Sequence, residues 1–168
     1  DESPISIEAD GHKINGSISQ PKDSDTVVLI IAGSGPTDRD GNQAQLQTNS
    51  YLMLAQALYK QGFATVRYDK RGVAGSADPA VDMNTLRFDR YVDDAVVWVD
   101  DLSKKFKHVV LMGHSIGGLM SLQVAQKRPV KAVITLAGMA SSGHTTLIRH
   151  LSAQPEFVKN IALPLLER

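Results

Sequence analysis

The chain has 168 residues, of which 42% are hydrophobic and 21% charged, a composition suited to one globular domain with a buried core. Its 18 basic and 18 acidic side chains cancel, which leaves no electrostatic basis for binding nucleic acid or a charged membrane surface. Cysteine is absent, which excludes disulfides, thiolate metal sites and cysteine nucleophiles.

Signals for membrane insertion and export are few. The longest apolar runs, such as residues 26–32, are far too short to cross a bilayer, so no membrane span is expected. The chain begins at Asp1 rather than at methionine, which indicates removal of an upstream segment, either by a signal peptidase or by the choice of the expressed segment. A periplasmic or secreted location is therefore the expectation, and the absence of cysteine is compatible with it.

The first elements in chain order are predicted strands. Residues 4–9 and 14–19 alternate between apolar and polar side chains around Asp10-Gly11, a pair typical of tight turns, and so predict an N-terminal β-hairpin. Residues 26–32 (TVVLIIA) form an uninterrupted run rich in β-branched side chains, which indicates a strand buried on both faces of a parallel sheet. A glycine-rich loop follows, over residues 33 to about 47.

Strands and helices then alternate. Helical spacing of apolar residues begins at Tyr51 and ends before Gly62. Further strands are predicted over residues 64–68, 108–113 and 130–136, and a helix over 116–127. Another helix, of roughly five turns, is predicted from an apolar face made of Phe88, Val92, Ala95, Val99, Leu102 and Phe106. This alternation predicts an α/β fold, a mostly parallel sheet with helices on both faces.

The most informative motif is Gly113-His114-Ser115-Ile116-Gly117, which fits G-x-S-x-G between a buried strand and a helix. A serine on such a sharp turn has a strained backbone and an exposed hydroxyl, and the flanking glycines relieve crowding. The helix that follows offers backbone N–H groups and a positive dipole end to developing negative charge. Ser115 is therefore the candidate nucleophile, and His114 is expected to point away from it. A glycine-rich turn needed only for close helix–sheet packing is the structural alternative.

Together with two further loops, this motif resembles the α/β-hydrolase family, in the branch of bacterial esterases and serine aminopeptidase-like enzymes. Residues 32–42 (AGSGPTDRDGN) resemble the oxyanion loop of that branch, although Ala32 stands where the branch usually has histidine. Residues 68–76 (YDKRGVAGS) resemble its D-x-R-G-x-G-x-S loop with an altered glycine spacing. The resemblance implies that residues 1–140 are the N-terminal part of the hydrolase core, with the C-terminal strands missing, and that residues 141–168 begin the cap or lid helices.

The resemblance also implies a function and its residues. Ser115 would form an acyl-enzyme with carboxylic ester or related acyl bonds of a small-molecule substrate, and the backbone N–H groups of Ser34 and Ile116 would form the oxyanion hole. The charged residues of both loops are interpreted as ion pairs that hold loop geometry: Asp38, Arg39, Asp40, Asp69 and Arg71. No metal and no organic cofactor is expected, since this chemistry needs none.

The rest of the triad is not evident. In this family the chain order is serine, acid, histidine, but no aspartate follows Ser115. His144 and His150 both precede the only later acids, Glu156 and Glu167, so neither is interpreted as the general base. We therefore expect the chain by itself to be an inactive fragment.

The region after the last predicted strand is expected to be helical. Residues 141–168 predict two short helices that break near Pro155. Met139 and His144 lie where the family places its lid, and they are interpreted as substrate-binding residues. A complementary C-terminal fragment, or a second copy of the chain, is the expected partner for the open sheet edge. A naturally short, inactive relative is the third possibility.

Other site classes fit less well. The third glycine of a dinucleotide fingerprint would fall at Asp38, which would repel a pyrophosphate, and no P-loop motif occurs. Asp38, Asp40 and Asn42 lack the glycine and glutamate that complete a calcium loop. The alternative from another class is a non-catalytic ligand-binding module that keeps the hydrolase scaffold.

Overall fold

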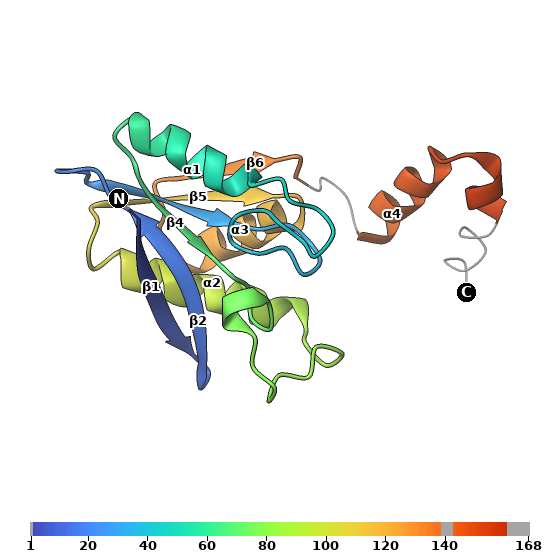
Figure 1. Ribbon diagram of the computed structural model, residues 1–168, viewed down its shortest axis with the longest axis horizontal. Coiled ribbons are helices and arrows are strands. Elements are labelled where there is room, and N and C mark those ends of the chain that lie inside the picture. Colours follow the sequence, from blue (N-terminus) through green and yellow to red (C-terminus); the bar gives the residue numbers. More distant parts are fainter. Residues whose placement is uncertain (1, 139–142, 161–168) are drawn as a thin grey trace. The chain divides into compact units, whose positions relative to one another are not determined.

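The computed structural model describes residues 2–138 and 143–160, in two compact units that span residues 1–138 and 139–168. The first unit contains a six-stranded sheet of order β1-β2-β4-β3-β5-β6 (Figure 1). Its strands are β1 (Glu2–Ala9), β2 (His12–Ser19), β3 (Thr26–Ile31), β4 (Ala64–Tyr68), β5 (His108–His114) and β6 (Ala132–Leu136). Its helices are α1 (Ser50–Lys60), α2 (Phe88–Leu102) and α3 (Ile116–Lys127), with a 3-10 turn over Ala74–Ser76.

The N-terminal hairpin is confirmed and is longer than predicted. β1 and β2 pair antiparallel from Glu2↔Ser19 to Ala9↔His12. The turn residues Asp10 and Gly11 both have positive φ, 51° and 73°, as a type I′ turn requires. β2 also pairs antiparallel with β4, which attaches the hairpin to the parallel strands β4, β3, β5 and β6.

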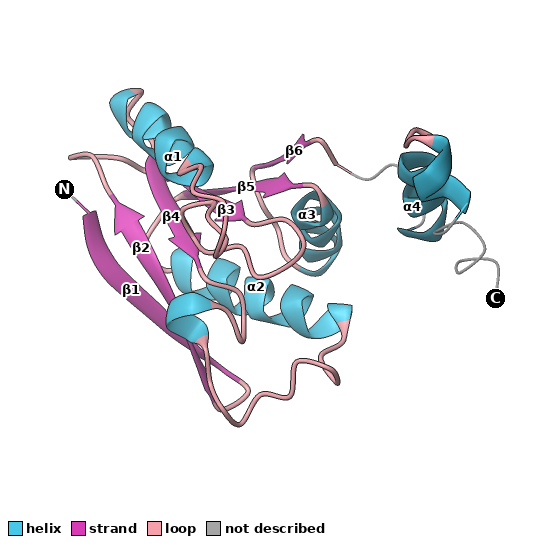
Figure 2. Cartoon of the chain, turned by 45° about the vertical axis from the view of Figure 1, so that its right-hand side comes forward, coloured by secondary structure: helices cyan, strands magenta, loops and turns pink. Residues whose placement is uncertain are grey.

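Helices cover both faces of the sheet, as the alternating pattern predicts (Figure 2). Successive side chains of a strand point to opposite faces. In β3, Leu29 and Ile31 therefore belong to the core under α2 and α3, whereas Val28 and Ile30 belong to the core under α1. This double burial is the physical reason for the uninterrupted apolar run, and it fixes β3 at the centre of the sheet.

Two predicted boundaries differ from the structure. The helix predicted at roughly five turns ends at Leu102, because residues 103–105 turn out of the helix. Phe106 lies beyond that turn, yet it is buried in the same core as the helix face. The last strand begins at Ala132 rather than at residue 130.

β6 lies at the end of the sheet and, among the described strands, pairs only with β5. Ala132, Ile134 and Thr135 are exposed, and 39% of Ile134 is accessible. The strand therefore has one supported edge and one open edge.

The second unit is helical in its described part, as predicted. α4 spans Gly143–Ser152, and residues 156–160 form a further helical turn after Pro155. None of the helices within residues 2–138 and 143–160 is long and apolar enough to cross a bilayer.

Candidate active site

Ser115 occupies a strained turn between β5 and α3. Its φ of 53° and ψ of −119° lie outside the regions that residues with a side chain normally adopt. The N–H of Ser115 donates to the carbonyl oxygen of Leu136 at 2.9 Å, and its own carbonyl accepts the N–H of Gly118 at 3.0 Å. The residue is partly exposed. The turn thus has the geometry that the G-x-S-x-G pattern predicts.

The two glycines of the motif are required by close backbone packing. A Cβ on Gly113 would overlap the carbonyl oxygen of Gly117. A Cβ on Gly117 would lie 2.8 Å from the carbonyl oxygen of Ala32 and closer still to that of Ile31. Only glycine allows α3 to start directly against the backbone of the central strand, and this packing places Ser115 at the carboxyl edge of the sheet.

The loop after β3 runs beside this turn. A Cβ on Gly33 would lie 3.0 Å from Nδ1 of His114 and 3.4 Å from Cβ of Ser115. Within the described part of the chain, neither the N–H of Ser34 nor that of Ile116 donates a hydrogen bond. Ile116 is the first residue of α3, where backbone N–H groups have no partner inside the helix and the helix dipole is positive. Both amides predicted for the oxyanion hole thus have no acceptor within residues 2–138 and 143–160.

His114 is bonded to a tyrosine. The hydroxyl of Tyr51, in α1, accepts the N–H of Gly33 at 3.1 Å and lies 2.8 Å from Nδ1 of His114. Burial raises the pKa of Tyr51, so the hydroxyl keeps its proton and can donate it to Nδ1. His114 thus has a structural partner, as expected. The sequence pattern indicated Tyr51 only as part of a helix face, and its role in the loop was missed.

Lys70 is a second residue that the sequence analysis did not single out. It follows β4 and is buried, and its ammonium group donates to the carbonyl oxygens of Gly33 and, at 3.1 Å, Gly35. Burial lowers the pKa of Lys70 to about 8, so the side chain is mostly protonated at neutral pH. A lysine at the carboxyl end of a buried parallel strand was the available signal, because such positions lie at the active-site edge of α/β sheets.

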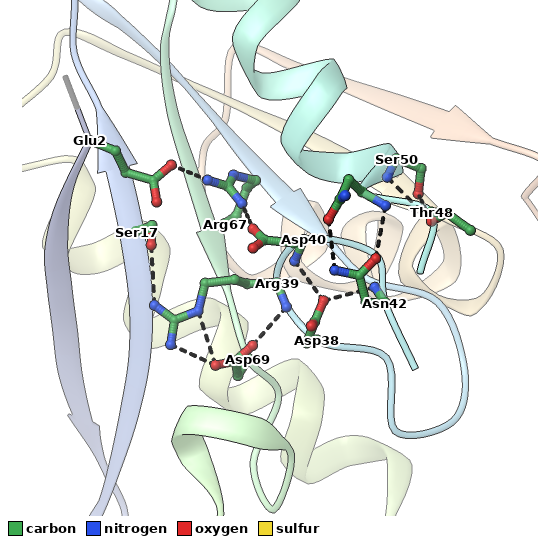
Figure 3. Close-up of polar contacts among 11 residues, drawn as sticks. Glu2, Ser17, Asp38, Arg39, Asp40, Asn42, Thr48, Ser50, Arg67 and Asp69 are labelled. Atoms are coloured by element: carbon green, nitrogen blue, oxygen red, sulfur yellow. Dashed lines mark hydrogen bonds and ion pairs between the residues drawn. The ribbon is translucent and has the colours of Figure 1, made fainter. Parts of the chain in front are cut away.

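Arg39 and Asp40, in the loop after β3, form ion pairs as predicted, whereas Asp38 accepts only backbone N–H groups among the described residues (Figure 3). Arg39 donates to the Asp69 carboxylate from its backbone N–H at 2.7 Å and from its guanidinium at 2.6 and 3.0 Å. Arg67 pairs with both Asp40 and Glu2. These contacts join the loop to β4 and to the start of β1.

A single carboxylate shapes the tip of this loop. Oδ1 of Asp38 accepts the N–H of Asp40 at 2.9 Å and that of Asn42 at 2.8 Å. Asn42 in turn accepts the N–H of Asn49 at 2.8 Å, just before α1 begins (Figure 3). The side chains that suggested a calcium loop thus already have donors: backbone N–H groups for Asp38 and Asn42, and the guanidinium of Arg67 for Asp40.

Arg71 makes a different and fully buried ion pair. Its guanidinium donates to both oxygens of Asp94, in α2, at 2.6 and 3.0 Å, and to the carbonyl oxygen of Ala9 at 2.8 Å. Burial raises the pKa of Asp94, and the hydrogen bond from Arg71 opposes that shift. The pair connects the loop after β4 with the hairpin and with α2, which confirms its structural interpretation.

Comparison with known proteins identifies the family. The model of the serine aminopeptidases of family S33, which are α/β-hydrolases, matches residues 46–167. The chain belongs to this family. It is 29% identical over 142 residues to esterase EstD of Thermotoga maritima, and the match covers 80% of this chain and 33% of EstD. It is 31% identical over 102 residues to the human mitochondrial palmitoyl-protein thioesterase ABHD10, with 61% of this chain and 31% of ABHD10 covered.

Solved structures support the same fold for this S33 family member. VinJ superimposes with a TM-score of 0.72 at 18% identity, over 96% of this chain and 53% of VinJ. An esterase of Pyrococcus furiosus superimposes with a TM-score of 0.71 at 16% identity, over 99% of this chain and 61% of the esterase. The chain therefore spans about a third of the curated relatives named above and between half and two thirds of these structures.

Two predicted substrate-binding residues stay predictions. Met139 and the side chain of His144 lie outside the described residues. His150 is exposed on α4, in the second unit. Across residues 2–138 and 143–160, no group of three or more metal-binding side chains could hold a metal ion.

Proposed function

We propose that this chain carries the nucleophile of a serine hydrolase that acts on carboxylic ester or related acyl bonds. The observation that supports this most strongly is the backbone of Ser115, held at φ 53° against the N-terminus of α3 and beside Gly33. The strain positions the hydroxyl at the carboxyl edge of the sheet, where a substrate carbonyl can approach it. Attack by the serine oxygen on the acyl carbon would form the acyl-enzyme and expel the alcohol or thiol.

The backbone N–H groups of Ser34 and Ile116 are the proposed oxyanion donors. They would need to lie about 2.7–3.1 Å from the oxyanion of the tetrahedral intermediate. Support comes from the absence of any other acceptor for these two amides in the described ranges and from the proximity of Gly33 to Ser115. Donors that are fixed before the reaction stabilise the transition state without reorganisation.

The relatives of the chain support a proposal about the substrate class. EstD is an esterase and ABHD10 a palmitoyl-protein thioesterase, and both cleave bonds between an acyl group and a leaving oxygen or sulfur. We propose a carboxylic ester or thioester as the substrate, and Met139 and His144 as residues that contact it.

The general base and its acid are proposed to lie outside these 168 residues. Ser115 is followed by Glu156 and Glu167 as the only acids, and both come after His144 and His150. The serine–acid–histidine order of this fold thus has no match here. A complementary segment that carries an acid and a histidine would supply both groups and cover β6, whereas a second copy of these 168 residues would cover the edge alone.

Ser115→Ala is expected to abolish labelling by a fluorophosphonate probe and to reduce ester hydrolysis by roughly 10⁴-fold or more, because the acyl-enzyme can no longer form. Both should be measured on the natural full-length protein and on the 168-residue chain, with the labelled peptide identified by mass spectrometry. We expect labelling at Ser115 in the full-length protein and little ester hydrolysis by the 168-residue chain.

Ser103→Ala is the matched control, since Ser103 is an exposed serine at the end of α2 and should leave labelling unchanged. Full ester hydrolysis by the 168-residue chain, lost in Ser115→Ala, would contradict the proposal about the base. No labelling in the full-length protein would favour a non-catalytic ligand-binding module instead.

A further inference from the structure

Lys70 is buried without a carboxylate partner in the part of the chain that the structure describes. It is only 5% exposed, and its hydrogen bonds go to two main-chain carbonyl groups. Lysine is among the residues that are rarely buried unless they are paired, because removing the ammonium group from water is costly. A role for this buried cation is therefore to be sought at its two acceptors, the carbonyl groups of Gly33 and Gly35.

Those hydrogen bonds end on both sides of Ser34. The first acceptor is the carbonyl oxygen of Gly33 and the second is that of Gly35. The carbonyl between them, that of Ser34, accepts the hydroxyl of Thr37 at 3.1 Å. Three consecutive carbonyl groups of the oxyanion loop are thus fixed by side-chain donors.

The Gly33 carbonyl decides where the Ser34 amide points. The two groups belong to one peptide unit, and in a planar trans peptide the C=O and N–H bonds point in opposite directions. A donor that holds the carbonyl of Gly33 on one side consequently directs the N–H of Ser34 to the other. The preceding peptide is held as well, because the N–H of Gly33 donates to the Tyr51 hydroxyl at 3.1 Å.

We propose that Lys70 is a positioning residue that orients the N–H of Ser34 as an oxyanion donor, through its hydrogen bond to the carbonyl of Gly33. This inference rests on the proposed function, and it assigns to Lys70 no contact with substrate. A loop with glycine on both sides of Ser34 has little stiffness of its own, so an external donor is needed to fix it. A charged donor also polarises the Gly33–Ser34 peptide, which makes its N–H a stronger donor.

The test compares Lys70→Met, which keeps the length but removes all donors, with Lys70→Gln, which keeps a neutral donor. In the full-length protein, Lys70→Met is expected to lower kcat for ester hydrolysis by about 10- to 100-fold, somewhat less than deletion of one oxyanion donor. KM should change by less than about twofold, because the substrate carbonyl engages the donor weakly before it becomes an oxyanion. The kcat of Lys70→Gln should lie between that of the wild-type protein and that of Lys70→Met.

A transition-state analogue separates positioning from general stability. The affinity for a trifluoromethyl ketone, which forms a tetrahedral oxyanion on Ser115, should fall in Lys70→Met by the same factor as kcat. Lys60→Met, an exposed lysine at the end of α1, is the matched control and should change neither quantity.

Unchanged kcat and analogue affinity in folded Lys70→Met would overturn the proposal. A rise in KM with unchanged kcat would also overturn it. A fall in kcat without a fall in the affinity for the analogue would do the same. If Lys70→Met does not fold, the same comparison is made with Lys70→Gln. Failure of the proposed function is distinguishable, because wild-type protein would then neither bind the analogue nor label at Ser115.

Discussion

Gly117→Ala is expected to destabilise the protein by roughly 3 kcal/mol or more and to remove the reactivity of Ser115 toward a fluorophosphonate. The new methyl group would lie 2.8 Å from the carbonyl oxygen of Ala32 and closer to that of Ile31. Both oxygens belong to backbone at the end of β3, the central strand, which cannot move aside without breaking its ladders with β4 and β5. The helix would have to lift from the sheet, and Ser115 would move with it.

Urea unfolding followed by circular dichroism measures this loss of stability. Gly118→Ala, one residue later, is the matched control. Its methyl group would lie 3.3 Å from the side chain of Thr135 and 3.4 Å from the carbonyl oxygen of Gly113, close to ordinary van der Waals contact, and alanine raises helix propensity at the same time. We expect a change of less than about 1 kcal/mol for this control. Equal stability of the two variants would show that α3 does not start as tightly against β3 as the structure indicates.

Arg71→Met is expected to cost about 3–5 kcal/mol, because it leaves the carboxylate of Asp94 buried without its partner. Both side chains are almost inaccessible, at 3% and 2%. The free energy of unfolding should be measured for both proteins as a function of pH. The difference between wild type and Arg71→Met is expected to become smaller as the pH is lowered. The unpaired Asp94 has its pKa raised by burial and then avoids the charge by binding a proton.

The double variant Arg71→Met/Asp94→Leu should recover much of this stability, since an apolar pair of similar volume needs no compensating charge. Arg128→Met is the control for removing an arginine from an ion pair at the surface. Its pair with Asp100 is 42% and 43% exposed, so a much smaller cost than that of Arg71→Met is expected. A cost for Arg71→Met as small as that of the control would contradict the assignment of a buried, structural pair.

Much of the fold was predictable because its signals are local. The β-branched run of β3, the Asp10-Gly11 turn and the turn at Ser115 between β5 and α3 are each encoded within a short stretch of sequence, and the structure has all three elements where they were predicted. The end of α2 was predicted too late because Phe106 continues the helical spacing and is buried, although the chain has already left the helix. Side-chain burial and backbone conformation are separate quantities, and periodicity reports only the first.

The residues missed at the candidate site have distant partners. Lys70 contacts a carbonyl 37 positions away, and Tyr51 contacts a histidine 63 positions away. Such pairs follow from the order of the strands in the sheet, which a single sequence does not specify. The kind of contact could be anticipated for the charged loops, where ion pairs were expected. The identity of the partners could not be anticipated. Arg67, for example, contacts Glu2 because β2 pairs with β4 and so brings the hairpin beside Arg67.

One hydrogen bond of the serine turn has a consequence for how the site responds to its surroundings. The amide of Ser115 donates to the carbonyl of Leu136, the last residue of the strand whose outer edge is open. Fraying of that strand would release the amide to solvent, so its deuterium uptake should report how firmly the edge is held. A segment that docks on β6 would slow this exchange, so the exchange rate of the Ser115 amide would show whether that edge is covered.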